Sequence, residues 1–127
     1  MRWLALCLVL GWLSKTPCFS APLFNFETGL QGWQCRGERQ RVENTQEAAA
    51  DGRRSLALVC DGASDGWLAV AGEFDWQQLA AISYTVWLPE DAPVSCLVVP
   101  YVKDRDYNWY EAEPQQVSAG SRRVGTI

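Results

Sequence analysis

The residues best suited to chemistry lie close together between positions 101 and 111, where aromatic and charged side chains alternate. The candidates there are Tyr101, Lys103, Asp106, Tyr107 and Trp109. Sugar rings dock their apolar C–H faces on aromatic rings, while their hydroxyl groups need hydrogen-bond donors and acceptors. This stretch therefore predicts a carbohydrate-binding site around one hairpin, with a partly exposed Trp109 beside Tyr101 or Tyr107. A position in the core is the competing interpretation for Trp109 and Tyr107.

Trp87 is a further candidate for sugar binding, although it stands on a separate expected strand. On that strand Ile82, Tyr84 and Val86 should share one face, while Trp87 should point to the other, because side chains alternate along a strand. Trp87 is therefore a weaker candidate than Trp109.

Catalysis has little support in the sequence. The chain contains no histidine, which excludes Ser-His-Asp and Cys-His mechanisms. Glu111 and Glu113 share a face of one expected strand and could form the carboxylate pair of a glycoside hydrolase, although two such residues usually mark a solvated face. We therefore predict binding without catalysis, with a fragment of a glycoside hydrolase as one alternative.

The first twenty residues are typical of a secretory signal peptide. Arg2 precedes an apolar run over residues 3–13, and the small residues Cys18 and Ser20 suit cleavage before Ala21. The run is shorter than the ~20 residues that a membrane-spanning helix needs. The mature protein should therefore be residues 21–127, secreted or periplasmic. An uncleaved anchor or a buried segment is the alternative.

The charge and the cysteines narrow the range of partners. The 11 Lys and Arg face 15 Asp and Glu, giving a formal net charge of −4, which disfavours nucleic acid as a partner. Cys35, Cys60 and Cys96 remain after the leader and form no CxxC pair, which disfavours a zinc site. They can form at most one internal disulfide, for which Cys35–Cys60 competes with three free thiols.

Short apolar stretches separated by turn residues predict an all-β single domain, most simply a β-sandwich. An irregular stretch should begin at Gly32, and Trp33 and Trp76 should belong to the core. Pro100 should mark a bulge or an edge position in an otherwise central strand, because proline cannot donate to the ladder. One helical turn is expected over residues 76–80. The expected strands cover residues 23–27, 55–60, 67–74, 82–88, 94–103 and 107–113, with one more within 117–127.

Four motifs in this order resemble the carbohydrate-binding modules of galactose-binding-like jelly-roll type that are attached to secreted glycoside hydrolases. They are FNFETGLQGW (24–33), DGRRSLAL (51–58), FDWQQLAAISYTVWLP (74–89) and VVPYVKDRDYNWYEAEP (98–114). The resemblance implies a jelly-roll β-sandwich that binds a polysaccharide. Such modules continue with further strands, the last beside the first, so we expect the domain to be incomplete at its C-terminal end.

The same resemblance implies a structural calcium ion. Its ligands would be Glu27 together with groups of the loop that contains Asp51 and Arg53. An ordinary exposed position on a strand is the alternative for Glu27. A structural or adhesive domain that uses the same sandwich for protein contacts is the alternative function.

Overall fold

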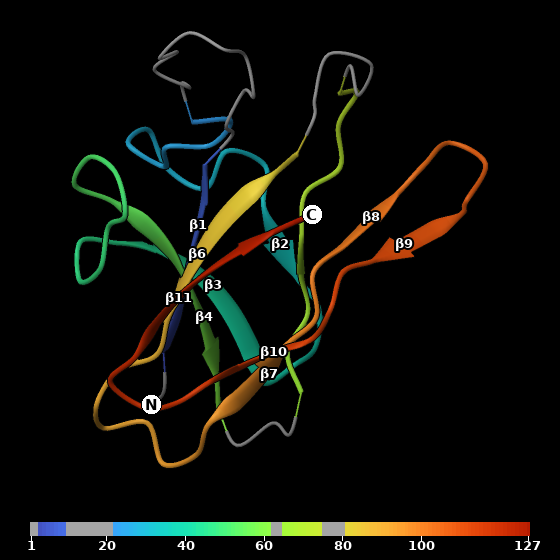
Figure 1. Cartoon of the computed structure of the whole chain (residues 1–127). Coiled ribbons are helices and arrows are strands. Elements are labelled where there is room, and N and C mark those ends of the chain that lie inside the picture. The colour runs from blue at the N-terminus through green and yellow to red at the C-terminus, as the bar shows by residue number, and fades with distance from the viewer. Residues whose placement is uncertain (1–2, 10–21, 62–64, 75–80) are drawn as a thin grey trace, which may run out of the picture.

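The computed structural model describes residues 3–9, 22–61, 65–74 and 81–127. Every regular element in these ranges is a β-strand, which confirms the prediction of an all-β chain (Figure 1). In the same ranges no helix is long and apolar enough to cross a membrane. The expected helical turn at 76–80, with Trp76, and the expected cleavage position before Ala21 lie outside the described residues.

The largest sheet has five strands in the order β11-β6-β1-β4-β3, and all neighbours are antiparallel. Strand β1 belongs to the segment that the sequence predicts as a leader, yet its backbone pairs with β4 on one side and β6 on the other. The strands of this sheet are β1 (Trp3–Val9), β3 (Gln40–Thr45), β4 (Ser55–Cys60), β6 (Ser83–Trp87) and β11 (Arg122–Thr126).

The strands β4 and β6 agree with the sequence prediction. Strand β4 has the expected bounds, and its first five residues are all buried, as in a strand covered on both faces. Strand β6 alternates, with Tyr84 and Val86 buried and Ser83, Thr85 and Trp87 half-buried. The period of two therefore fixed which face of β6 points inward.

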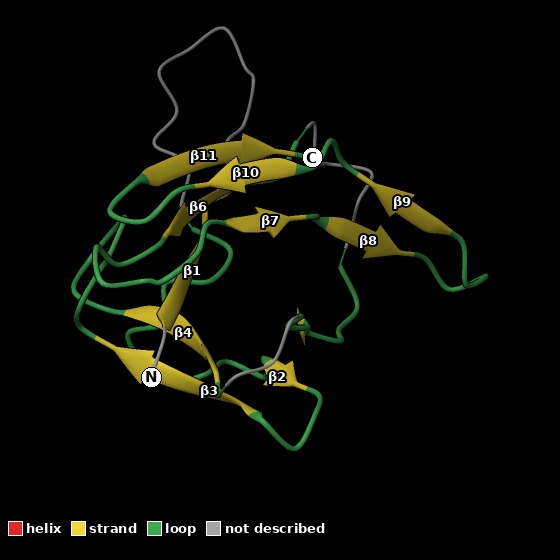
Figure 2. Ribbon diagram, turned by 90° about the horizontal axis from the view of Figure 1, so that it is seen from below, coloured by secondary structure: helices red, strands yellow, loops and turns green. Residues whose placement is uncertain are grey.

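A two-stranded sheet packs over the inward face of β6 (Figure 2). It consists of β7 (Cys96–Val98) and β10 (Gln115–Val117). Its side chains Cys96, Val98 and Val117 close a hydrophobic cluster with Tyr84, Val86 and Leu88. This contact between the five-stranded sheet and the sheet of β7 and β10 forms the two-layered part of the fold.

The hairpin of β8 (Tyr101–Lys103) and β9 (Trp109–Glu111) extends outward from that second layer. Strand β8 follows β7 directly, and β9 leads back to β10. In Figure 1 the hairpin, drawn in orange, reaches away from the five-stranded sheet. Strand β9 of this hairpin is exposed along its whole length, whereas Tyr101 and Val102 of β8 are half-buried.

A second hydrophobic cluster lies under the N-terminal loop of the domain, near the small sheet of β2 (Gln34–Cys35) and β5 (Leu68–Ala69). Its buried centre is Phe26, Trp33 and Leu56. Trp33 is 8% exposed, which confirms its predicted place in the core, and Phe24 meets it edge-on with ring centroids 5.4 Å apart.

The prediction of a strand over residues 23–27 is wrong, because this segment is irregular. Phe26 has a left-handed backbone with φ of 59°. Its N–H group donates to Gln31 Oε1 at 2.9 Å, and its carbonyl oxygen accepts from Asn44 Nδ2 at 2.7 Å. Side-chain partners thus satisfy the backbone groups that a ladder would otherwise bond.

The expected strand over residues 94–103 is interrupted at Pro100, where β7 ends and β8 follows. Pro100 lies in a break between two strands rather than at a bulge within one strand, and the predicted central position of the strand is wrong. Both halves belong to two-stranded sheets, and Leu97 is 65% exposed. An apolar run is not enough to show that a second sheet covers it.

Two further segments differ from the sequence prediction. Residues 67–74 contain only the short β5, and the stretch expected to be irregular after Gly32 contains the six-residue β3. Strand β3 is polar, which hid it from the hydrophobic pattern. An edge strand can keep polar side chains half-exposed while its backbone pairs with a single neighbour, here β4.

Candidate functional site

The turn between β8 and β9 is held together by one carboxylate. Asp104 Oδ1 accepts the Asn108 N–H at 2.9 Å, and Oδ2 accepts from Asn108 Nδ2 at 2.9 Å and from the Tyr110 hydroxyl at 3.2 Å. Its backbone joins in, since the Tyr107 N–H donates to the Asp104 carbonyl oxygen at 3.2 Å. These bonds define a polar turn over residues 104–108.

These hydrogen bonds change how the turn titrates. The bonds from Asn108 stabilise the ionised form and hold the pKa of Asp104 below its usual range, and the pKa of Tyr110 is raised because its hydroxyl donates to this carboxylate. Asp104 therefore acts as the support of the hairpin. Asp106 is exposed at the turn, and its backbone N–H also donates to Asp104.

The register of the hairpin divides its side chains between two faces. Val102 lies opposite Tyr110, while Lys103 lies opposite Trp109 and Tyr101 opposite Glu111. Because alternate residues share a face, Tyr101, Lys103, Trp109 and Glu111 stand together. The rings of Tyr101 and Trp109 are 4.7 Å apart at 35°, and Trp109 is 54% exposed.

Lys103 connects Trp109 to the turn. Its Nζ lies 4.0 Å from the centre of the Tyr107 ring and 5.1 Å from that of Trp109. Tyr107 is 74% exposed and has a left-handed backbone with φ of 66°, so its expected place in the strand with Trp109 is wrong. The Tyr107 ring is nevertheless linked to Trp109, because the Lys103 ammonium lies over both rings.

Sequence reasoning missed two members of this surface, Trp67 and Arg36. Burial raises the pKa of Tyr101, and a hydrogen bond with the Trp67 side chain partly offsets the rise. The Arg36 guanidinium lies 4.8 Å from the centre of the Trp67 ring. We call Trp67, Tyr101, Trp109 and Tyr107 the aromatic row. No spacing in the sequence joins Trp67 to Tyr101, since only the fold brings them together.

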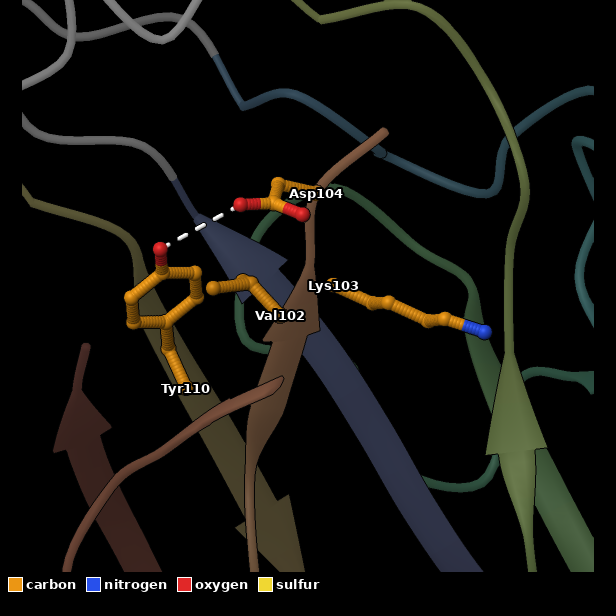
Figure 3. Close-up of a pocket in the computed structure, with 4 residues that line it drawn as sticks. All are labelled: Val102, Lys103, Asp104 and Tyr110. Atoms are coloured by element: carbon orange, nitrogen blue, oxygen red, sulfur yellow. Dashed lines mark hydrogen bonds between the residues drawn. The ribbon is translucent and has the colours of Figure 1, made fainter. Parts of the chain in front are cut away.

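The hairpin also carries a shallow pocket of about 220 Å³, lined by Val102, Lys103, Asp104 and Tyr110. Figure 3 shows the Tyr110 hydroxyl bonded to Asp104, with the Lys103 side chain extending away from Tyr110. The pocket is smaller than the ~300–1,000 Å³ of most small-molecule sites. The aromatic row is therefore the stronger candidate.

Trp87 does not join the aromatic row. It is half-buried on β6, at a position that alternates with Tyr84 and Val86. Those two side chains pack toward β7 and β10, so Trp87 points to the other face of the five-stranded sheet. The predicted sugar-binding residues therefore lie together at the hairpin, except Trp87, which lies elsewhere on β6.

The Glu27 carboxylate holds a loop. Its Oε1 accepts the N–H groups of Arg53 at 2.7 Å and Arg54 at 2.9 Å, while Asp51 is exposed. No group of three or more acidic, cysteine or histidine side chains suited to a metal gathers within the described ranges. Ca²⁺ takes six to eight oxygen ligands, and Oε1 of Glu27 already accepts two N–H groups, so this oxygen is poorly placed to bind the ion. Cys35, Cys60 and Cys96 carry free thiols.

Comparisons with known proteins do not identify a relative of this chain. No protein family, curated protein or solved structure matches it.

Proposed function

We propose that this chain is a secreted, noncatalytic carbohydrate-binding module with a jelly-roll type of sandwich, and that the aromatic row binds a polysaccharide. The observation that carries the proposal is the half-exposed Trp109, 4.7 Å from Tyr101 on an outward-reaching hairpin. A sugar ring stacks on such a surface through its apolar face.

The polar groups around the row suit sugar hydroxyls. The Lys103 ammonium can donate hydrogen bonds to sugar hydroxyls, and the exposed Glu111 carboxylate, opposite Tyr101, can accept hydrogen bonds from them. The layer of β7 and β10 over β6 supports the sandwich, since two antiparallel layers share one core there. The apolar leader supports export.

The test compares two neighbouring aromatic residues of β9. Trp109 and Tyr110 are both 54% exposed but lie on opposite faces of the hairpin. We expect Trp109→Ala to weaken binding about ten- to a hundred-fold, measured with a polysaccharide that slows the unmodified protein in affinity electrophoresis, because the variant loses one stacking ring. Tyr110→Ala, the matched control, should retain binding within about threefold.

Affinity electrophoresis through gels containing a panel of neutral and acidic polysaccharides measures these affinities, and calorimetry confirms the strongest. Circular dichroism establishes that each variant is folded. Equal losses for the two variants would remove the assignment to the Trp109 face, and the absence of retardation by every polysaccharide would remove the function.

A structural or adhesive function is the second candidate, because an apolar strip stands near β7. Val94 is 66% exposed, Leu97 65% and Val99 42%. Exposed apolar surface of this kind is typical of protein contacts. Leu97→Glu should abolish concentration-dependent association in sedimentation velocity if this strip is an interface, and it should leave polysaccharide binding unchanged.

A further inference from the structure

Two basic side chains lie over rings of the aromatic row. The Arg36 guanidinium lies 4.8 Å from the centre of the Trp67 ring. At the other end of the row, Lys103 Nζ lies 4.0 Å from the centre of the Tyr107 ring and 5.1 Å from that of Trp109. A cation over an aromatic face occupies the same layer as a sugar ring that stacks on the neighbouring face.

Neither cation is neutralised by a carboxylate of the protein. Arg36 and Lys103 are exposed, and within the ranges that the structure describes the ion pairs are made by Arg41 and Arg105 instead. Burial raises the pKa of Tyr101, and the positive charge of Arg36 works against that rise, so this charge also acts on the middle of the row. An incoming anion therefore meets both cations without displacing a protein carboxylate.

The acidic side chains of the hairpin are divided between its faces. Glu111, opposite Tyr101, is the carboxylate on the face of the row. Asp104 and Asp106 act on the other face, because both raise the pKa of Tyr110, Asp104 the more strongly. The net charge of the chain acts weakly on a bound ligand, since charges more than about 10 Å apart are largely screened at about 0.1 M salt. The local balance along the row is therefore positive.

We propose that the aromatic row binds an acidic polysaccharide, and that Arg36 and Lys103 recognise the carboxylates of its uronic acids. The inference rests on the proposed function, because it names the chemical class of the polysaccharide bound there. A uronic acid carries its carboxylate directly on a ring carbon, so the charge of a stacked sugar lies at the edge of the ring, level with the cations. The planar guanidinium can bind a carboxylate through two parallel hydrogen bonds, and the ammonium attracts it as a point charge.

A single-stranded nucleic acid is the competing polyanion, because its bases also stack on aromatic side chains. Proteins that bind it follow the phosphate backbone with a positively charged groove. The row offers two cations, and the whole chain has 15 Asp and Glu against 11 Lys and Arg. This sparse positive charge fits a polymer whose charges lie on the stacked rings themselves.

The experiment compares two polymers with the same backbone and different charge, polygalacturonate and its fully methyl-esterified form. Affinity electrophoresis of the full chain measures binding to each polymer, with single-stranded DNA as a third ligand. Arg36→Gln and Lys103→Gln each remove one cation of the row. Arg122→Gln, at an exposed position on β11, is the matched control for the change in net charge. Circular dichroism establishes that each variant is folded.

We expect the unmodified protein to prefer polygalacturonate over its ester. Arg36→Gln and Lys103→Gln should each reduce this preference about two- to fivefold, the usual effect of one exposed ion pair, whereas Arg122→Gln should leave it unchanged. Glu111→Gln should strengthen binding to polygalacturonate alone, because it removes the repelling carboxylate. Added NaCl should weaken binding to polygalacturonate more than binding to the ester.

Two results would overturn the acidic class while polysaccharide binding stands. One is equal affinity for the two polymers, and the other is a preference that neither Arg36→Gln nor Lys103→Gln reduces. Tighter binding of single-stranded DNA than of polygalacturonate would replace the sugar by a nucleic acid. Trp109→Ala should weaken binding to both polymers alike, since stacking does not depend on the charge of the sugar. Failure of every polysaccharide to slow the protein would instead remove the proposed function itself.

Discussion

The contact between Glu27 and Gly52 gives the sharpest test of how the loop before β4 is held. Gly52 has φ of 69°, and a Cβ built on it would lie 2.5 Å from Glu27 Oε1. That distance is below any ordinary contact, so Gly52→Ala must displace the carboxylate. The displacement breaks the bonds from Arg53 and Arg54 to the same oxygen.

The magnitudes follow from these two effects. Glu27→Ala should cost about 1–3 kcal/mol of unfolding free energy, because it removes two hydrogen bonds to an exposed carboxylate. Gly52→Ala should cost about 1–2 kcal/mol for the left-handed backbone, plus a similar loss of the Glu27 bonds. In the Glu27→Ala background only the backbone term remains, so the double variant should be more stable than additivity predicts by about 1–3 kcal/mol.

Urea denaturation followed by tryptophan fluorescence measures the unfolding free energy of the four proteins in this double-mutant cycle, which are the wild type, the two single variants and the double variant. Gly120→Ala is the matched control, because Gly120 has nearly the same φ, 70°, and its nearest neighbour is the Glu90 side chain rather than Glu27. Its effect should add to that of Glu27→Ala within about 0.5 kcal/mol. Equal costs of Gly52→Ala in both backgrounds would refute the reasoning.

Four further predictions concern other parts of the chain. Because the pKa of Asp104 is lower in the folded turn than in the unfolded chain, the ionised carboxylate stabilises the turn at pH values above the unfolded pKa of about 4. Proteolysis of the turn should therefore accelerate as the pH falls below about 4. Asp104→Asn should remove this pH dependence. Trp33→Ala should lower stability by about 3–5 kcal/mol in thermal melts, since the ring is buried in the core. Melting temperatures should be equal in EDTA and in millimolar Ca²⁺, and a rise with Ca²⁺ would support the calcium site that the resemblance implies. N-terminal sequencing of exported protein should begin Ala-Pro-Leu-Phe.

The sequence predicted those elements whose side chains carry a clear period. Strand β6 alternates buried and half-buried residues, and β4 is a continuous apolar run between turns, so both were located correctly. The exposure of Trp109 beside Tyr101 was also expected, because aromatic and charged residues alternate around a turn sequence.

The sequence predictions that proved wrong concern features that depend on contacts between distant segments of the chain. Nothing local indicates that Asn44 bonds the Phe26 carbonyl oxygen, which removes residues 23–27 from the ladder. The pairing of polar β3 with β4 and the approach of Trp67 to Tyr101 are likewise products of the assembled sheet. A pattern of side chains within one segment cannot encode such long-range partners.

The left-handed backbone of Tyr107 sets the stability of the turn against the proposed sugar binding at a single residue. Glycine adopts this conformation freely, whereas a tyrosine there costs about 1 kcal/mol. A designer seeking only a more stable hairpin would replace it, and would thereby remove the ring that lies against Lys103. If the aromatic row binds sugar as proposed, a variant of this turn that is stabilised by glycine at position 107 should be a poorer binder.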